Sequence, residues 1–170
     1  LRETKLTQNN TLKHLKTLQE NNLLISTKKT GNTFYRLNIK NSQLLSLLSY
    51  FDYKKLESLP SARKRAIIEF LNKIANKPLI ALVFGSTAKG TFNEQSDIDL
   101  LLVFNKKEND NPKLKEEIEA VTGTKIQTFI IDLNHFKEQA LKQDDKVVSH
   151  AIKTGFIIIG HYIFYNEVLK

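Results

Sequence analysis

Two aspartates, Asp97 and Asp99, stand at the start of an apolar run that continues to Phe104. Side chains alternate between the two faces of a strand, so carboxylates at i and i+2 point the same way, about 7 Å apart. The pattern places Asp97, Asp99 and Leu101 on one face, and residues 98, 100 and 102 on the other. Burying two like charges is costly without a cation between them, and Mg²⁺ typically binds through one or two carboxylates plus substrate phosphates. The pair therefore predicts a divalent-cation site.

A second apolar run precedes the aspartates, over residues 79–84, and ends in the small-residue pair Gly85-Ser86. A turn made of such residues presents backbone N–H groups and a hydroxyl, and these groups can hold a phosphate. We expect the turn and the two carboxylates to lie at the same end of one sheet. The alternative is a surface hairpin in which both acids are solvated.

The motifs Gly85-Ser86, Ala88-Lys89-Gly90 and Ser96-Asp97-Ile98-Asp99-Leu100 follow one another at a fixed interval. This series resembles the DNA polymerase β-like nucleotidyltransferase superfamily, in particular its minimal nucleotidyltransferases, with Lys89 where arginine is usual. The resemblance implies an α/β (α+β) fold in which helices flank a small mixed sheet. It also implies ATP or another nucleotide triphosphate as substrate and Mg²⁺ held by Asp97 and Asp99. The nucleotide phosphates would contact Gly85, Ser86, Lys89 and Ser96.

In that superfamily a third carboxylate, on the next strand, shares a metal and activates the attacking hydroxyl. Gln127 stands at the corresponding place in the expected strand 125–131, and the residues of its parity, Phe129 and Ile131, are apolar. Asp132 is offset from Gln127 by an odd number and should point to the other face. A neutral amide cannot act as a base at neutral pH. We therefore expect nucleotide and one Mg²⁺ to bind, with transfer slow or absent.

The N-terminal part is basic, since residues 1–60 hold ten Lys and Arg against four Asp and Glu. Leucines at helical spacing predict a helix over 6–21 capped by Thr7, and two short strands around Gly31-Asn32 predict a β-hairpin. This order resembles the second half of a winged helix-turn-helix, whose helix enters the major groove and whose wing meets the backbone. The resemblance implies DNA contacts by Gln8, Asn9, Asn10, Lys13, His14, Lys28, Lys29 and Arg36. Such modules also serve in dimerisation or protein docking.

Three parts are predicted along the chain: a partial winged helix over 1–40, a connecting helix over 41–60 and a nucleotidyltransferase domain over 61–170. The leucine-rich connecting helix either forms a homodimer seam or packs on its own domain. Pro60 should end it, with Ser61 capping a helix over 62–76. Helices are expected at 113–121, 133–142 (capped by Asp132 or Asn134), 144–153 and 161–169, and a last strand at 156–159. The run VVSHAIKTGFIIIG is similar to the tail of archaeal proteins that join a winged helix to a nucleotidyltransferase domain.

Composition bounds the remaining possibilities. The 170 residues include no cysteine, which excludes disulfides, and no apolar run approaches the length of a membrane helix or forms a signal peptide. A cytoplasmic protein with no membrane partner is expected. The four histidines, His14, His135, His150 and His161, lie at no metal-ligand spacing and are interpreted as surface or capping residues. The chain starts at Leu1 and lacks methionine, so we expect a fragment whose first winged-helix helix lies before Leu1.

Two hypotheses of different classes follow. One is a Mg²⁺-dependent enzyme that transfers AMP from ATP to a hydroxyl, and the resemblance to minimal nucleotidyltransferases suggests a HEPN-type toxin protein as the acceptor. The other is a DNA-binding regulator or antitoxin whose transferase domain binds nucleotide with little or no turnover. A small-molecule acceptor, as in aminoglycoside nucleotidyltransferases, is a third alternative, although the chain is short for it.

Overall fold

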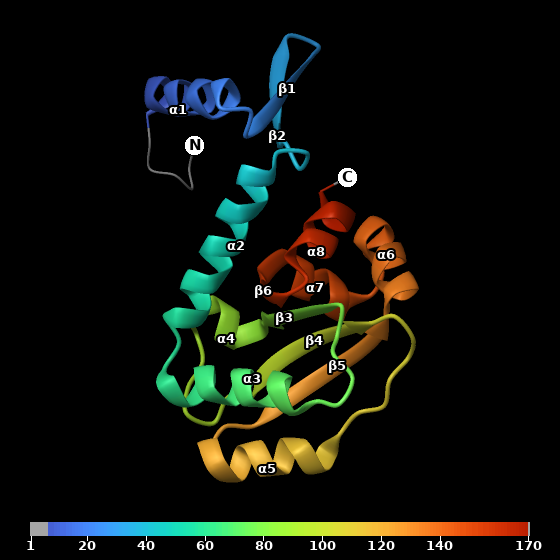
Figure 1. Ribbon diagram of the computed structural model, residues 1–170. Helices are drawn as coiled ribbons and strands as arrows, with labels where there is room; N and C mark the ends of the chain where they lie inside the picture. Colours follow the sequence, from blue (N-terminus) through green and yellow to red (C-terminus); the bar gives the residue numbers. More distant parts are fainter. Residues whose placement is uncertain (1–6, 170) are drawn as a thin grey trace. The chain divides into compact units, whose positions relative to one another are not determined.

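The computed structural model describes residues 7–169, and the chain divides into two compact units within helix α2 (Ser42–Glu57) (Figure 1). One unit ends at Leu48 and the other runs from Ser49 to Val168. The limits predicted for three parts of the chain stay a prediction.

The first unit contains helix α1 (Gln8–Glu20), strands β1 (Leu24–Lys29) and β2 (Asn32–Leu37), and the start of α2. Thr7 caps α1 as predicted, since its side chain accepts a hydrogen bond from the Asn10 N–H. The strands pair antiparallel from Leu24 opposite Leu37 to Lys29 opposite Asn32, which confirms the hairpin. Gly31 supplies a positive φ of 79° at the turn.

The second unit is built on a four-stranded sheet in the order β5-β4-β3-β6. Its strands are β3 (Ile80–Phe84), β4 (Ile98–Phe104), β5 (Ile126–Asp132) and β6 (Phe156–Ile159). β4 runs parallel to β5 and antiparallel to β3, and β3 runs antiparallel to β6. The predicted small mixed sheet with flanking helices is confirmed.

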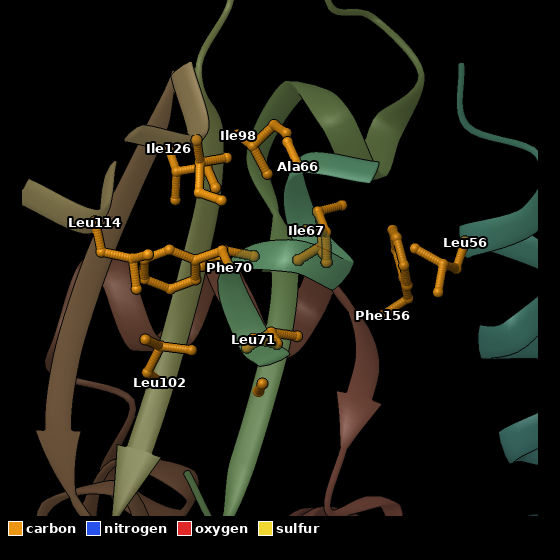
Figure 2. Packing of buried hydrophobic residues seen from close by; sticks show 14 of the residues in the cluster. Leu56, Ala66, Ile67, Phe70, Leu71, Ile98, Leu102, Leu114, Ile126 and Phe156 are labelled. Carbon is orange, nitrogen blue, oxygen red and sulfur yellow. The ribbon is translucent and has the colours of Figure 1, made fainter. Parts of the chain in front are cut away.

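Helices cover both faces of this sheet, which explains why β3 and β4 are apolar on both faces. One face packs against α3 (Ser61–Lys73) and α5 (Pro112–Thr122), and Figure 2 shows Phe70 and Ile67 of α3 lying on this face. The other packs against α6 (Leu133–Lys142), α7 (Lys146–Thr154) and α8 (His161–Val168). The two central strands are thus held rigidly between two apolar layers.

Two local predictions differ from the structure, and a third is narrowed to one of its two alternatives. Ser61 is the first residue of α3 and not its cap, because the chain enters the helix from Pro60 without a side-chain capping bond. The Gly-Ser turn is the start of a short helix, α4 (Gly85–Lys89), and the following strand begins at Ile98, one residue after Asp97. Of the two cap candidates for α6, Asp132 is the cap and accepts a 2.9 Å hydrogen bond from the His135 N–H.

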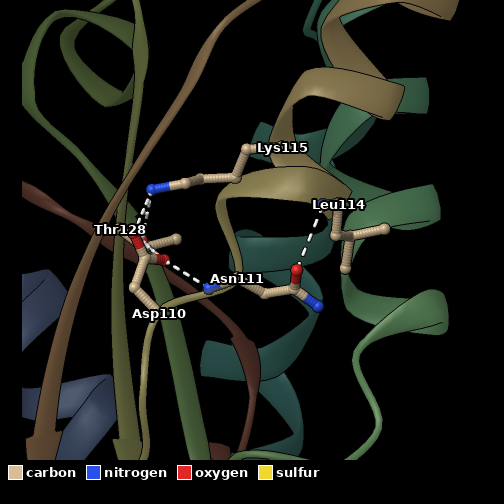
Figure 3. Close-up of polar contacts among 5 residues, drawn as sticks. All are labelled: Asp110, Asn111, Leu114, Lys115 and Thr128. Carbon is tan, nitrogen blue, oxygen red and sulfur yellow. Dashed lines mark hydrogen bonds and ion pairs between the residues drawn. The ribbon is translucent and has the colours of Figure 1, made fainter.

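A polar network fastens α5 to the outer strand β5 (Figure 3). Asp110 pairs with Lys115 and accepts a 2.7 Å hydrogen bond from the Thr128 hydroxyl. The next residue, Asn111, caps α5 through a 3.2 Å bond from the Leu114 N–H. Because Thr128 follows Gln127 in β5, the network also fixes the strand segment beside the aspartates.

A buried polar pair ties α8 to the part of α2 that belongs to the second unit. The Tyr165 hydroxyl donates a 2.8 Å hydrogen bond to Asp52 Oδ2, and Asp52 is 4% exposed. Burial raises the pKa values of Asp52 and Tyr165 above their ordinary values.

None of the helices described between residues 7 and 169 combines the length and apolarity needed to cross a membrane.

Candidate active site

The carboxylate pair lies on a central strand, at the end of the sheet where β4 begins. Asp99 is opposite Phe84 on β3 and level with Gln127 on β5. The predicted alternation is confirmed along the strand: Leu101 packs among α6, α7 and α8, whereas Ile98 packs on the face of α3 and α5. The pairing with β3 and β5 therefore fixes Phe84 and Gln127 as the neighbours of Asp99.

The Asp99 carboxylate lies against Gly85, whose lack of a side chain leaves room for it. Gly85 has a φ of +67°, a left-handed conformation that favours glycine. A Cβ at this position would overlap Asp99 Oδ2 and come within 3.1 Å of Asp99 Cγ. The Asp99 carboxylate thus occupies the space that any other side chain at position 85 would fill. Position 85 therefore requires glycine for two reasons: the left-handed backbone and the closeness of this carboxylate.

The surroundings of Asp99 disfavour a negative charge on its carboxyl next to the charge of Asp97. Burial, and next the charge of Asp97, raise the pKa of the Asp99 carboxyl above its ordinary value, while His150 opposes the shift. A divalent cation bound between two carboxylates would remove that repulsion. The donor set therefore fits a hard cation such as Mg²⁺.

The described chain does not supply a complete coordination sphere. Across residues 7–169, no group of three or more His, Cys, Asp and Glu side chains could hold a metal ion. Mg²⁺ usually keeps water molecules and takes one or two carboxylates together with substrate phosphates. Asp97 and Asp99 match the protein part of this kind of site.

Arg63 of α3 holds the loop that leads from α4 to the aspartates. Its guanidinium donates to Thr87 Oγ1 at 2.9 Å and to the backbone oxygens of Asn93 and Ser96 at 2.9 and 2.6 Å. It also lies over the Phe92 ring, 4.3 Å from the centroid, and it is 5% exposed. Since Ser96 directly precedes Asp97, Arg63 fixes the entry to β4.

Sequence analysis missed Arg63, although a signal was present. Arg63 shares helical spacing with Ala66, Ile67 and Phe70, all of them buried. A cation in the apolar stripe of an amphipathic helix needs partners inside the protein. The loop carbonyls and Thr87 are those partners.

Comparison with known proteins identifies the family. The family model described as "Polymerase beta, Nucleotidyltransferase" matches residues 65–155, more than half of the chain. The chain belongs to the polymerase beta nucleotidyltransferase family. No curated protein matches it.

Two solved structures are similar to this chain at 16% sequence identity, each comparison covering 64% of this chain and 84% of the other. One is a crystal structure of a toxin-antitoxin with AMP-PNP, with a TM-score of 0.46. The other is a mutant of the toxin-antitoxin MntA-HpeT, with a TM-score of 0.45.

The remaining predicted phosphate contacts lie on α4 and on the loop that leads to Asp97. Ser86 is half-buried in the first turn of α4, next to Gly85. Lys89 is exposed, and its Nζ lies 2.8 Å from His150 Nε2. The Ser96 hydroxyl exchanges 3.0 Å hydrogen bonds with Asn93, so it closes the loop. Phosphate binding by these residues stays a prediction.

Among the cavities that adjoin the motif, one lies beside Asp97 and Gln127 and another lies beside α4. One, of about 350 Å³, is lined by Asp97, Gln127 and charged residues of α5 such as Lys115, together with Lys125, which directly precedes β5. The other, of about 320 Å³, lies beside α4 and is lined by Lys89, Lys55, Phe92 and Phe156, among others. Gln127 therefore borders the same open cavity as Asp97.

The residues predicted to contact DNA all lie in the first unit, and each is exposed. Gln8, Asn9, Asn10, Lys13 and His14 lie on α1, Lys28 and Lys29 on β1, and Arg36 on β2. Their exposure is compatible with the predicted DNA contact but does not distinguish it from a solvated surface.

Proposed function

We propose that this chain is a Mg²⁺-dependent nucleotidyltransferase that transfers AMP from ATP to a hydroxyl group. The observation that carries the proposal is the half-buried pair Asp97 and Asp99, with Asp99 packed against the glycine that opens α4. Membership of the family supplies the reaction class.

The residues have separate roles in this proposal. Asp97 and Asp99 would hold Mg²⁺, which supplies positive charge to the nucleotide phosphates and to the departing pyrophosphate. The Gly85 backbone and the Ser86 hydroxyl bind the β- and γ-phosphates, with Lys89 and Ser96 at the margin of that site. The acceptor oxygen bonds to the α-phosphorus, the bond from that phosphorus to the β-phosphate oxygen breaks, and the hydroxyl proton passes to solvent. Catalysis in such a site rests on positioning and charge.

Gln127 limits the rate in this proposal, because an amide cannot take the proton of the acceptor hydroxyl. A carboxylate level with Asp99 would take it, and general-base assistance contributes about 10²-fold or more. We expect Gln127→Glu to raise AMP transfer by roughly tenfold to a hundredfold, measured with labelled ATP. Gln95→Glu, which adds the same charge to the exposed loop, should leave the rate unchanged. A Gln127→Glu rate equal to that of wild type would contradict the role.

The acceptor we propose is a tyrosine or another hydroxyl on a partner protein, a HEPN-type toxin being the first candidate. This rests on the resemblance of the motif to minimal nucleotidyltransferases. The test is transfer of label from α-labelled ATP to a co-expressed toxin, with Asp97→Asn as the inactive control. Label on a small aminoglycoside and none on protein would favour the small-molecule acceptor.

A homodimer through α2, which exposes Tyr50 and Phe51, stays a separate prediction.

A second candidate function is DNA binding by the first unit. The exposed pair Lys28 and Lys29 at the hairpin tip, within a basic N-terminal part, favours it. Each lysine that meets a phosphate contributes about one to the slope of log affinity against log salt. Replacing both with glutamine should therefore reduce that slope by about two in filter binding of duplex DNA. The exposed pair Lys106 and Lys107 in the second unit is the matched control, and an equal loss from both pairs would count against a wing contact.

A further inference from the structure

His150 of α7 is held in a fixed orientation beside the candidate site. Its ring meets Phe84 edge-on, with centroids 6.0 Å apart and planes at 80°. Phe84 in turn packs on Phe129 at 5.4 Å and pairs with Asp99 across β3 and β4. The imidazole is half-buried, and it is near enough to Asp99 to act on that carboxyl electrostatically.

The contact between His150 and Lys89 determines which imidazole nitrogen carries the proton. An ammonium group has only donors, so the 2.8 Å contact requires His150 Nε2 to be the unprotonated acceptor, with the proton on Nδ1. Lys89 is otherwise an exposed, flexible side chain at the last position of α4. The histidine therefore gives an exposed cation a defined place.

We propose that His150 is a positioning residue of the nucleotide site: it anchors the Lys89 ammonium at the end of α4, where the ammonium meets the phosphates of a nucleoside triphosphate. This inference rests on the proposed function. Arginine, usual at position 89 in the resembling family, has a planar fork that is pre-organised for phosphate, whereas lysine is a flexible point charge. The hydrogen bond to His150 compensates for that flexibility.

The test is a double-mutant cycle on the full chain, with Mg·ATP affinity measured by calorimetry. His150→Leu should weaken binding about threefold to tenfold. His150→Gln, whose amide oxygen can accept from Lys89, should recover most of the affinity. In a Lys89→Gln background, His150→Leu should cause no further loss, because the partner is already absent. Thermal unfolding of each variant reports any separate effect on folding.

Each outcome decides the inference. Equal affinity of wild type and His150→Leu would overturn it, and so would losses that add fully in the double variant. If wild type does not bind Mg·ATP, the proposed function itself fails and the inference falls with it. If wild type binds and only the cycle fails, the proposed function stands without His150. The nitrogen resonances of His150 provide a direct readout: a protonated Nε2 in the free protein would overturn the contact.

Discussion

Gly85→Ala should abolish Mg²⁺-dependent ATP binding in a protein that still folds. The new methyl group would overlap Asp99 Oδ2, and a carboxylate at the end of a side chain moves more easily than a central strand. Asp99 would therefore rotate away from the position it shares with Asp97. A displacement of about 1 Å in a site of this kind typically costs on the order of a hundredfold in activity. The measurement is calorimetric titration of ATP in the presence of Mg²⁺.

Gly123→Ala is the matched control for this substitution. Gly123 ends α5 with a φ of +68°, almost the same as that of Gly85, and nothing lies within 4 Å of its added Cβ. Both variants should lose about 1 kcal/mol of unfolding free energy, the cost of a left-handed alanine. Only Gly85→Ala should lose nucleotide binding. Wild-type affinity in Gly85→Ala would show that Asp99 is not where ATP and Mg²⁺ meet.

Arg63→Ala should cause the largest loss of stability outside the apolar core. It removes three hydrogen bonds of a charged donor and a ring contact, so Thr87 and two loop carbonyls each lose one hydrogen-bond donor. The expected loss is about 2–4 kcal/mol of unfolding free energy. Because this loop leads directly into Asp97, its loosening should misplace the Asp97 carboxylate. Mg·ATP affinity should therefore also fall by roughly tenfold or more. Urea unfolding and calorimetry measure the two effects.

The same helix provides a control. Arg65 makes only an exposed pair with Glu69 at 2.6 Å, one turn along α3. Arg65→Ala should cost less than about 0.5 kcal/mol, as exposed pairs do. Arg63→Lys keeps the charge but cannot reach Thr87 and the loop carbonyls together, so it should fall between wild type and Arg63→Ala. Equal unfolding free energies for Arg63→Ala and Arg65→Ala would contradict the role of Arg63.

The sheet and its motif could be predicted because the information is local. Apolar runs of five to seven residues between turn signals gave β3 and β4, and parity alone put Asp99 and Leu101 on one face. The resemblance to the superfamily implied that Gln127 stands where the third carboxylate is expected, and the parallel register places Gln127 level with Asp99. The limits of the elements were less certain, as at Ser61, where the residue after a proline can be either a cap or the first helical residue.

The long-range partners could not be read from the sequence. Lys89 and His150 are 61 residues apart, and only the packing of α7 beside β3 and α4 brings them together. A histidine with no neighbouring ligand residues is most simply interpreted as a surface group, which is how His150 was interpreted. Arg63 is 33 residues from Ser96, and its partners are backbone carbonyls, which leave no trace in residue types.

The central claim is that Asp97 and Asp99 form a Mg²⁺-dependent nucleotide site. Calorimetric titration of ATP with and without Mg²⁺, on wild type and on the Asp97→Asn/Asp99→Asn variant, tests it most directly. The amides keep the shape of the side chains and remove both charges, so the fold should persist. We predict binding by wild type only when Mg²⁺ is present, and none by the variant. Binding of equal strength in both proteins, or no binding in either, would contradict the claim.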